Sequence, residues 1–111
     1  MVYELSKFIK NMESIIHLEI KEIRLFGSCG RGEETVYSDL DLAIIFKKDT
    51  PPQRNKTYDL RDALETFIEE TFKRPVDFVH TNENNLDSQN QFNVNSHIRK
   101  EGKVLWTRTV I

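Results

Sequence analysis

The chain has 111 residues, of which 38% are hydrophobic and 31% are charged, and its formal net charge is −2. This length suits one domain over residues 1–111, and the composition excludes a chain that is disordered throughout. The charge argues against a uniformly basic nucleic-acid-binding surface, no apolar run approaches the roughly 20 residues that span a bilayer, and the first residues lack a signal-peptide pattern, so we expect a cytoplasmic protein.

The first half of the chain predicts one helix and two strands. Apolar residues recur at helical spacing over residues 3–17, which indicates an amphipathic helix ending near the end of that range. Ile20–Phe26 alternates apolar and charged side chains, as a half-buried strand does, and stops at Gly27. Leu40–Phe46 is nearly all apolar after Asp41, which is typical of a central strand covered on both faces.

The second half alternates helices and strands in the same way. After a polar break with two prolines at residues 47–55, the pattern predicts a helix over 56–72, a strand over 76–79, an asparagine-rich loop or weakly held helix over 81–95, a helix over 96–101 that Gly102 ends, and a strand over 103–111. This order indicates an α/β (α+β) fold in which helices pack on a small mixed sheet.

Two aspartates at the start of the central strand carry the clearest chemical signal. Side chains at positions i and i+2 of a strand lie on one face, about 6–7 Å apart, so Asp39 and Asp41 should point the same way. Two carboxylates this close repel each other unless a cation lies between them. A hard divalent cation such as Mg²⁺ is the natural partner for this pair.

A third aspartate, Asp77, lies between Val76 and Phe78 in the next short strand. An ionised carboxylate is costly to bury without a partner, so its place in an apolar strand is informative. If that strand neighbours Leu40–Phe46, the three carboxylates can hold two Mg²⁺ ions about 3.5–4 Å apart. Such a pair of ions serves in-line displacement at phosphorus.

The turn before the aspartates suits a phosphate group. Gly27 has no Cβ, so backbone amides can approach closely, and Ser28 adds a hydroxyl at what should be the start of a short helix. Arg31 either contacts a phosphate or forms a structural salt bridge. The pattern of Ser38 to Asp41 taken alone is also compatible with an N-capped turn and two solvated aspartates.

Other reactive side chains give weaker signals. Cys29 is the single cysteine, which excludes an intramolecular disulfide, and no histidine is placed beside it as a catalytic base. His17, His80 and His97 lack metal-ligand spacing, so surface or packing roles are expected. Trp106 fits either the core or an interface.

Taken together, these residues resemble the minimal nucleotidyltransferases of the DNA polymerase β superfamily. The motif is Gly27-Ser28, a ten-residue spacer, and Asp39-Leu40-Asp41, and its longer form also matches at Arg31, Gly32 and Ser38. The segments "RPVDFV" and "IRKEGKVLW" are similar to the later strand with the third aspartate and to the closing helix and strand.

The resemblance implies a role for each matching residue. Asp39 and Asp41 would bind both Mg²⁺ ions, and Asp77 would complete the site and help to deprotonate the attacking hydroxyl. The nucleotide-binding residues would be Gly27, Ser28, Arg31 and Ser38, with the first two on the triphosphate. The implied reaction is attack on the α-phosphorus of a nucleoside triphosphate, ATP in the family, with pyrophosphate leaving.

The small size of the chain narrows the resemblance further. Nucleotidyltransferases of this size are similar to the MNT antitoxins that pair with a HEPN-domain toxin, a ribonuclease, and transfer AMP to one of its tyrosines. The resemblance therefore implies a HEPN partner. Two alternatives stay open: nucleotidylation of a small molecule, with a homo-oligomer or partner completing the pocket, and a noncatalytic antitoxin that acts by binding.

Overall fold

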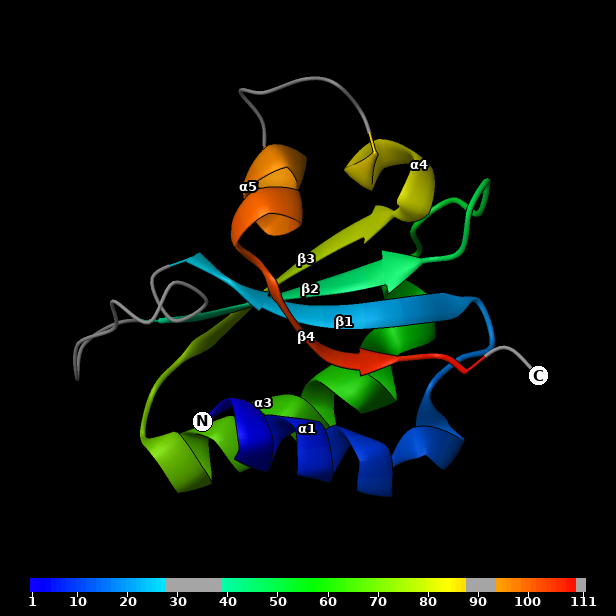
Figure 1. Cartoon of the computed structure of the whole chain (residues 1–111). Coiled ribbons are helices and arrows are strands. Elements are labelled where there is room, and N and C mark those ends of the chain that lie inside the picture. The colour runs from blue at the N-terminus through cyan, green and yellow to red at the C-terminus, as the bar shows by residue number, and fades with distance from the viewer. Residues whose placement is uncertain (28–38, 88–93, 110–111) are drawn as a thin grey trace.

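The computed structural model describes residues 1–27, 39–87 and 94–109. Helices and strands alternate along these residues as the sequence predicts, and the fold is a mixed α/β arrangement (Figure 1). The elements are α1 (Val2–Asn11), a 3₁₀ turn (Glu13–Ile15), β1 (Ile20–Phe26), β2 (Leu40–Phe46), a second 3₁₀ turn (Arg54–Thr57), α3 (Tyr58–Phe72), β3 (Val76–Asn82), α4 (Glu83–Leu86), α5 (Val94–Glu101) and β4 (Lys103–Thr107).

The four strands form one mixed sheet in the order β3-β2-β1-β4. β1 pairs antiparallel with both β2 and β4, whereas β2 and β3 are parallel. The parallel pair follows from the connection through α3, because a helical crossover returns the chain to the same edge. β3 is therefore the direct neighbour of β2, which is the condition set above for a third carboxylate.

Helices cover both faces of the sheet (Figure 1). α1 and α3 lie on one face, and α4 and α5 lie on the other. β2 contributes to both cores: its even-numbered residues join the larger cluster, with α1 and α3, while Ala43 and Ile45 join the smaller one, with Leu86 and Ile98. The prediction of a central strand buried on both faces is confirmed.

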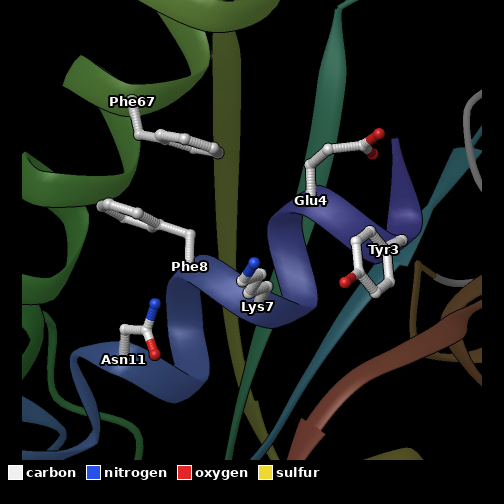
Figure 2. A pocket seen from close by; sticks show the side chains of 6 residues that line it. All are labelled: Tyr3, Glu4, Lys7, Phe8, Asn11 and Phe67. Carbon is white, nitrogen blue, oxygen red and sulfur yellow. The ribbon is translucent and has the colours of Figure 1, made fainter.

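The two long helices are joined by an aromatic stack. The rings of Phe8 on α1 and Phe67 on α3 lie 4.1 Å apart between centroids and are nearly parallel, as Figure 2 shows. Beside them is a hollow of about 310 Å³ that the side chains of α1 also line. This hollow lies on the α1 and α3 side of the sheet, away from the face of the aspartates.

The structure shortens some predicted elements and extends others. α1 ends at Asn11 and a 3₁₀ turn follows, so the first helix is shorter than the apolar pattern indicates. β3 continues to Asn82, whose side chain accepts a 2.8 Å hydrogen bond from the backbone N–H of Asn85 and so caps α4. The asparagine-rich segment is thus helical in part.

Two further predictions concern the glycine after the last helix and the place of Trp106. Helix α5 ends at Glu101, and a Cβ at Gly102 would collide with the carbonyl oxygen of Ile98, which explains the glycine at this stop. Trp106 belongs to the core, since it is only 6% exposed and its Nε1 donates a 2.7 Å hydrogen bond to Glu13. β4 ends at Thr107, earlier than predicted.

No helix in the described part of the chain is long and apolar enough to cross a membrane.

Candidate active site at the start of β2 and β3

The sheet brings two of the three predicted aspartates into direct register. Asp41 in β2 lies opposite Asp77 in the parallel strand β3, and on its other side it lies opposite Phe26 in β1. Asp39 comes directly before β2, two residues from Asp41. All three positions therefore lie at the end of the sheet where β2 and β3 begin and β1 ends.

The aspartates belong to the face that α4 and α5 cover. Side chains two residues apart in a strand share a face, so Asp41 lies on the side of Ala43, and Asp77 lies on the side of Val79. Both of these apolar neighbours pack in the smaller core cluster. At the start of β2 and β3, the face that packs in this core therefore carries aspartates in place of apolar side chains.

Gly27 lies directly against Asp41. Its φ is 72°, a left-handed conformation that favours glycine, and a Cβ built on it would lie 2.5 Å from Oδ2 of Asp41. The sequence predicts a close backbone approach at this residue, but it does not reveal that the approaching group is one of the aspartates. The sequence signal for this contact is that Gly27 directly follows one strand and Asp41 lies near the start of the next.

The negative charges of Asp39 and Asp77 act on the carboxyl group of Asp41. The pKa of Asp41 is raised above its ordinary value, first by burial and then by the negative charges of Asp77 and Asp39. Asp77 itself is exposed, because β3 is an edge strand, so its charge is solvated rather than buried. A cation placed among the three would remove the repulsion that raises the pKa of Asp41.

The chemistry of these residues fits Mg²⁺, although their present arrangement is open. Carboxylate oxygens are the donors that this ion prefers. Among the residues that the structure describes, no three carboxyl, imidazole or thiol groups are gathered closely enough to hold a metal ion. The convergence of Asp39, Asp41 and Asp77 on Mg²⁺ remains a prediction.

Several predicted site residues fall outside the described ranges. Ser28, Arg31 and Ser38 lie there, and so does Cys29.

Two of the histidines have local partners of the packing type expected. Nδ1 of His17 accepts a hydrogen bond from the backbone N–H of Glu19 at 3.1 Å, and Nε2 of His80 lies 2.7 Å from the hydroxyl of Thr57.

Comparison with known proteins identifies the family of the chain. The model of the family described as "Nucleotidyltransferase domain" matches residues 3–103. The chain is 30% identical, over 67 residues, to a protein of Methanocaldococcus jannaschii named "Putative protein adenylyltransferase"; the match covers 59% of this chain and 67% of that protein.

Two solved structures share the fold. One is described as a toxin-antitoxin with AMP-PNP; it has a TM-score of 0.57 and 20% identity, and the match covers 96% of this chain and 73% of that one. The other is a tri-AMPylated Shewanella oneidensis HEPN toxin in complex with MNT antitoxin, with a TM-score of 0.52, 20% identity, and coverage of 97% and 74%.

The family match includes nearly all the described elements and all three aspartates of the site. The resemblance seen in the sequence is therefore confirmed, and the chain belongs to the nucleotidyltransferase domain family of enzymes.

Proposed function

We propose that the protein transfers AMP from ATP to a hydroxyl group of a partner protein, and that the acceptor is a tyrosine of a HEPN-domain toxin. The observation that carries the proposal is the register of Asp41 with Asp77, with Asp39 two residues away, at one exposed edge of the sheet. The name of the Methanocaldococcus jannaschii relative supports protein adenylylation, and the Shewanella oneidensis neighbour supports a HEPN partner.

The proposed reaction is a displacement at the α-phosphorus of ATP. The tyrosine oxygen forms a bond to this phosphorus while the bond to the bridging oxygen breaks, and pyrophosphate leaves. Asp77 accepts the proton of the attacking hydroxyl, a role that suits an exposed carboxylate which the acceptor of another protein can reach.

The remaining residues would position the substrate and offset its charge. Asp39, Asp41 and Asp77 would hold two Mg²⁺ ions, which neutralise the triphosphate when bound. Gly27 keeps the space beside Asp41 free of a side chain, and with Ser28 it would receive the triphosphate. Arg31 and Ser38 would add contacts to the nucleotide.

Label transfer tests this proposal directly. The purified protein, Mg²⁺ and a purified HEPN-domain partner are incubated with ATP labelled on the α-phosphate, and in parallel with ATP labelled on the γ-phosphate. The Asp39→Asn/Asp41→Asn protein should lose transfer by about 10³-fold or more, because the site then lacks two metal-binding carboxylates. Asp59→Asn/Asp62→Asn is the matched control, since both residues are exposed on α3.

The outcomes separate the candidate functions. Only α-label on the partner, lost in the site variant and retained in the control, supports the proposal, and mass spectrometry then identifies the modified oxygen. Label on a small compound but not on protein means that the acceptor is a small molecule. If no label moves while the Asp39→Asn/Asp41→Asn protein still neutralises the toxin, the protein acts by binding alone.

A further inference from the structure

A basic hollow lies at the opposite end of the sheet from the aspartates. Its volume is about 460 Å³, and its lining residues are Lys21, Lys47, Lys48, Glu83, Arg108 and Thr109. The hollow is placed where β2 and β3 end, at the other end of the strands from Asp41 (Figure 1). At about 3.3 Å per residue, the seven-residue strand β2 separates the two sites by roughly 20 Å.

Two of the lysines are presented by a firmly anchored turn. The backbone N–H of Lys47 donates to the carbonyl of Glu19 at 2.8 Å, and that of Lys48 donates to Oε1 of Glu83 at 3.0 Å. The turn is closed by a 3.1 Å hydrogen bond from the N–H of Thr50 to the carbonyl of Lys47, with Asp49 in the left-handed conformation. The positions of both lysines are therefore fixed before any ligand binds.

The charges of these lysines are available to a ligand. Both side chains are exposed, and within the described residues the ammonium groups of Lys47 and Lys48 form no ion pair or hydrogen bond. Glu19, which has Lys47 as a weaker positive neighbour, is already paired with Lys56 at 2.8 Å. Glu83 is the one carboxylate among the described residues that line the hollow.

The other two cations are held by backbone carbonyls. Arg108 donates from Nε to the carbonyl of Ile20 and from Nη2 to that of His17, both at 3.0 Å, and its guanidinium lies 5.1 Å from the centre of the Trp106 ring. The ammonium group of Lys21 donates to the carbonyl of Arg108 at 3.2 Å. These neutral partners hold both side chains in place, and among the described residues the carboxylate of Glu13 also interacts electrostatically with Arg108.

We propose that this hollow binds a compact polyphosphate anion, either free or as the phosphate tail of a nucleotide. Among the described residues, four cations and one carboxylate line a hollow whose volume is typical of small-molecule sites, and the hydrogen bonds of the fold position the cations in advance. A long nucleic-acid backbone fits less well, because the chain as a whole carries a net charge of −2. The proposal does not depend on the function of the aspartate site.

Calorimetric titration with sodium tripolyphosphate in buffer with EDTA tests the proposal. Without divalent cations the three aspartates repel phosphate, so binding reports the basic hollow. Lys47→Gln/Lys48→Gln should weaken binding by about tenfold, through the loss of two charge-assisted contacts. Lys7→Gln/Lys100→Gln is the charge-matched control, because both lysines are exposed on helices away from the hollow, and it should bind within about twofold of the unaltered protein.

Further measurements show whether the bound phosphate is free or part of a nucleotide, and whether binding occurs at the basic hollow. ATP that binds as tightly as tripolyphosphate would show that a nucleotide tail is accepted, and weaker ATP binding would favour the free anion; both support the site. Asp39→Asn/Asp41→Asn should bind tripolyphosphate unchanged. The proposal is overturned if tripolyphosphate does not bind, if both lysine variants weaken binding equally, or if a single-stranded oligonucleotide binds and tripolyphosphate does not.

Discussion

The two faces of the sheet differ in how thickly they are covered, and the aspartates of the proposed active site lie on the thinner side. Among the described residues, the face under α1 and α3 carries the larger core cluster, whereas α4 and α5 cover the smaller one. α3 has 15 residues, while α4 has four and α5 has eight. Stability is thus concentrated on one face, and the other stays open at the edge where Asp41 and Asp77 lie.

This division follows from the alternation of side chains in β2. Leu42 and Ile44 point toward the larger core, while Asp41, Ala43 and Ile45 point toward the smaller one. A carboxylate at the start of the strand can therefore be polar and accessible while its immediate neighbours are fully buried. The comparison suggests that the larger core holds β2 in place and that the smaller face can be adapted to a nucleotide and an acceptor.

The largest expected effect compares two adjacent isoleucines with no exposed surface. Ile44→Ala should lower the free energy of unfolding by about 4 kcal/mol, because the long helices α1 and α3 cannot collapse into the cavity. Ile45→Ala should cost about 2 kcal/mol, since the short helices α4 and α5 can move closer. Urea unfolding measures both values. Equal losses would mean that the two faces are equally rigid.

The next effect concerns the glycine that touches the site. Gly27→Ala should cost about 1–2 kcal/mol, because alanine is strained at a φ of 72° and its Cβ would meet Oδ2 of Asp41 at 2.5 Å. The same change should reduce nucleotide transfer by at least about tenfold, since the Asp41 carboxylate must turn away.

A double-mutant cycle separates the two causes of that loss. In an Asp41→Ala background the contact with Oδ2 no longer exists, so Gly27→Ala should cost only the backbone strain, about 1 kcal/mol. An unchanged cost in that background would show that Asp41 does not limit the space at Gly27.

The central strand was predictable from the sequence and the structure confirms it, whereas the convergence of the three aspartates on one metal site stays a prediction. The apolar run Leu40–Phe46 indicates burial on both faces, and the spacing of Asp39 and Asp41 indicates a shared face, because both signals are local. The pairing of Asp41 with Asp77 is not local. It depends on α3 returning the chain to the edge of β2, so the sequence supports it only as a condition.

Two other features were only partly predictable. The asparagine-rich segment was expected to be a loop or a weakly held helix, and the structure shows a short helix in part of it. Helix α4 begins at a cap made by the Asn82 side chain, within a segment whose composition resembles a loop. The contact between Gly27 and Asp41 depends on the antiparallel register of β1 and β2, which apolar alternation does not specify. The predicted roles of Ser28, Arg31 and Ser38 stay predictions, since these residues lie outside the described ranges.

A pH-dependent effect belongs to the thickly covered face. Burial, followed by the charges of Arg54 and Arg61, lowers the pKa of His80 to about 4, from an ordinary value of 6.5. The unfolded chain therefore takes up a proton at His80 below about pH 6.5 and the folded chain does not until about pH 4, so acid in this window destabilises the fold.

The expected loss between pH 7 and pH 4 is about 1–2 kcal/mol from this group, discounted for solvent screening because the side chain is only partly buried. Urea unfolding at pH 7, 5.5 and 4 measures it against His80→Gln, which cannot titrate and should show a correspondingly flatter decline. Parallel declines for the two proteins would assign the acid sensitivity to other groups.

The smallest effect lies at Asp41 on the thinner face, and its sign distinguishes a functional carboxylate from a structural one. The pKa of Asp41 is raised from 3.8 by burial and by the charges of Asp77 and Asp39, so its ionised form destabilises the fold at pH 7. Asp41→Asn should therefore raise the free energy of unfolding by about 0.5 kcal/mol at pH 7, discounted for solvent screening, and the gain should vanish below about pH 3, where the unfolded chain is also protonated. Asp62→Asn on the exposed side of α3 should bring no such gain. A loss of stability in Asp41→Asn at pH 7 would contradict this expectation. It would mean that the negative charge of Asp41 stabilises the folded chain.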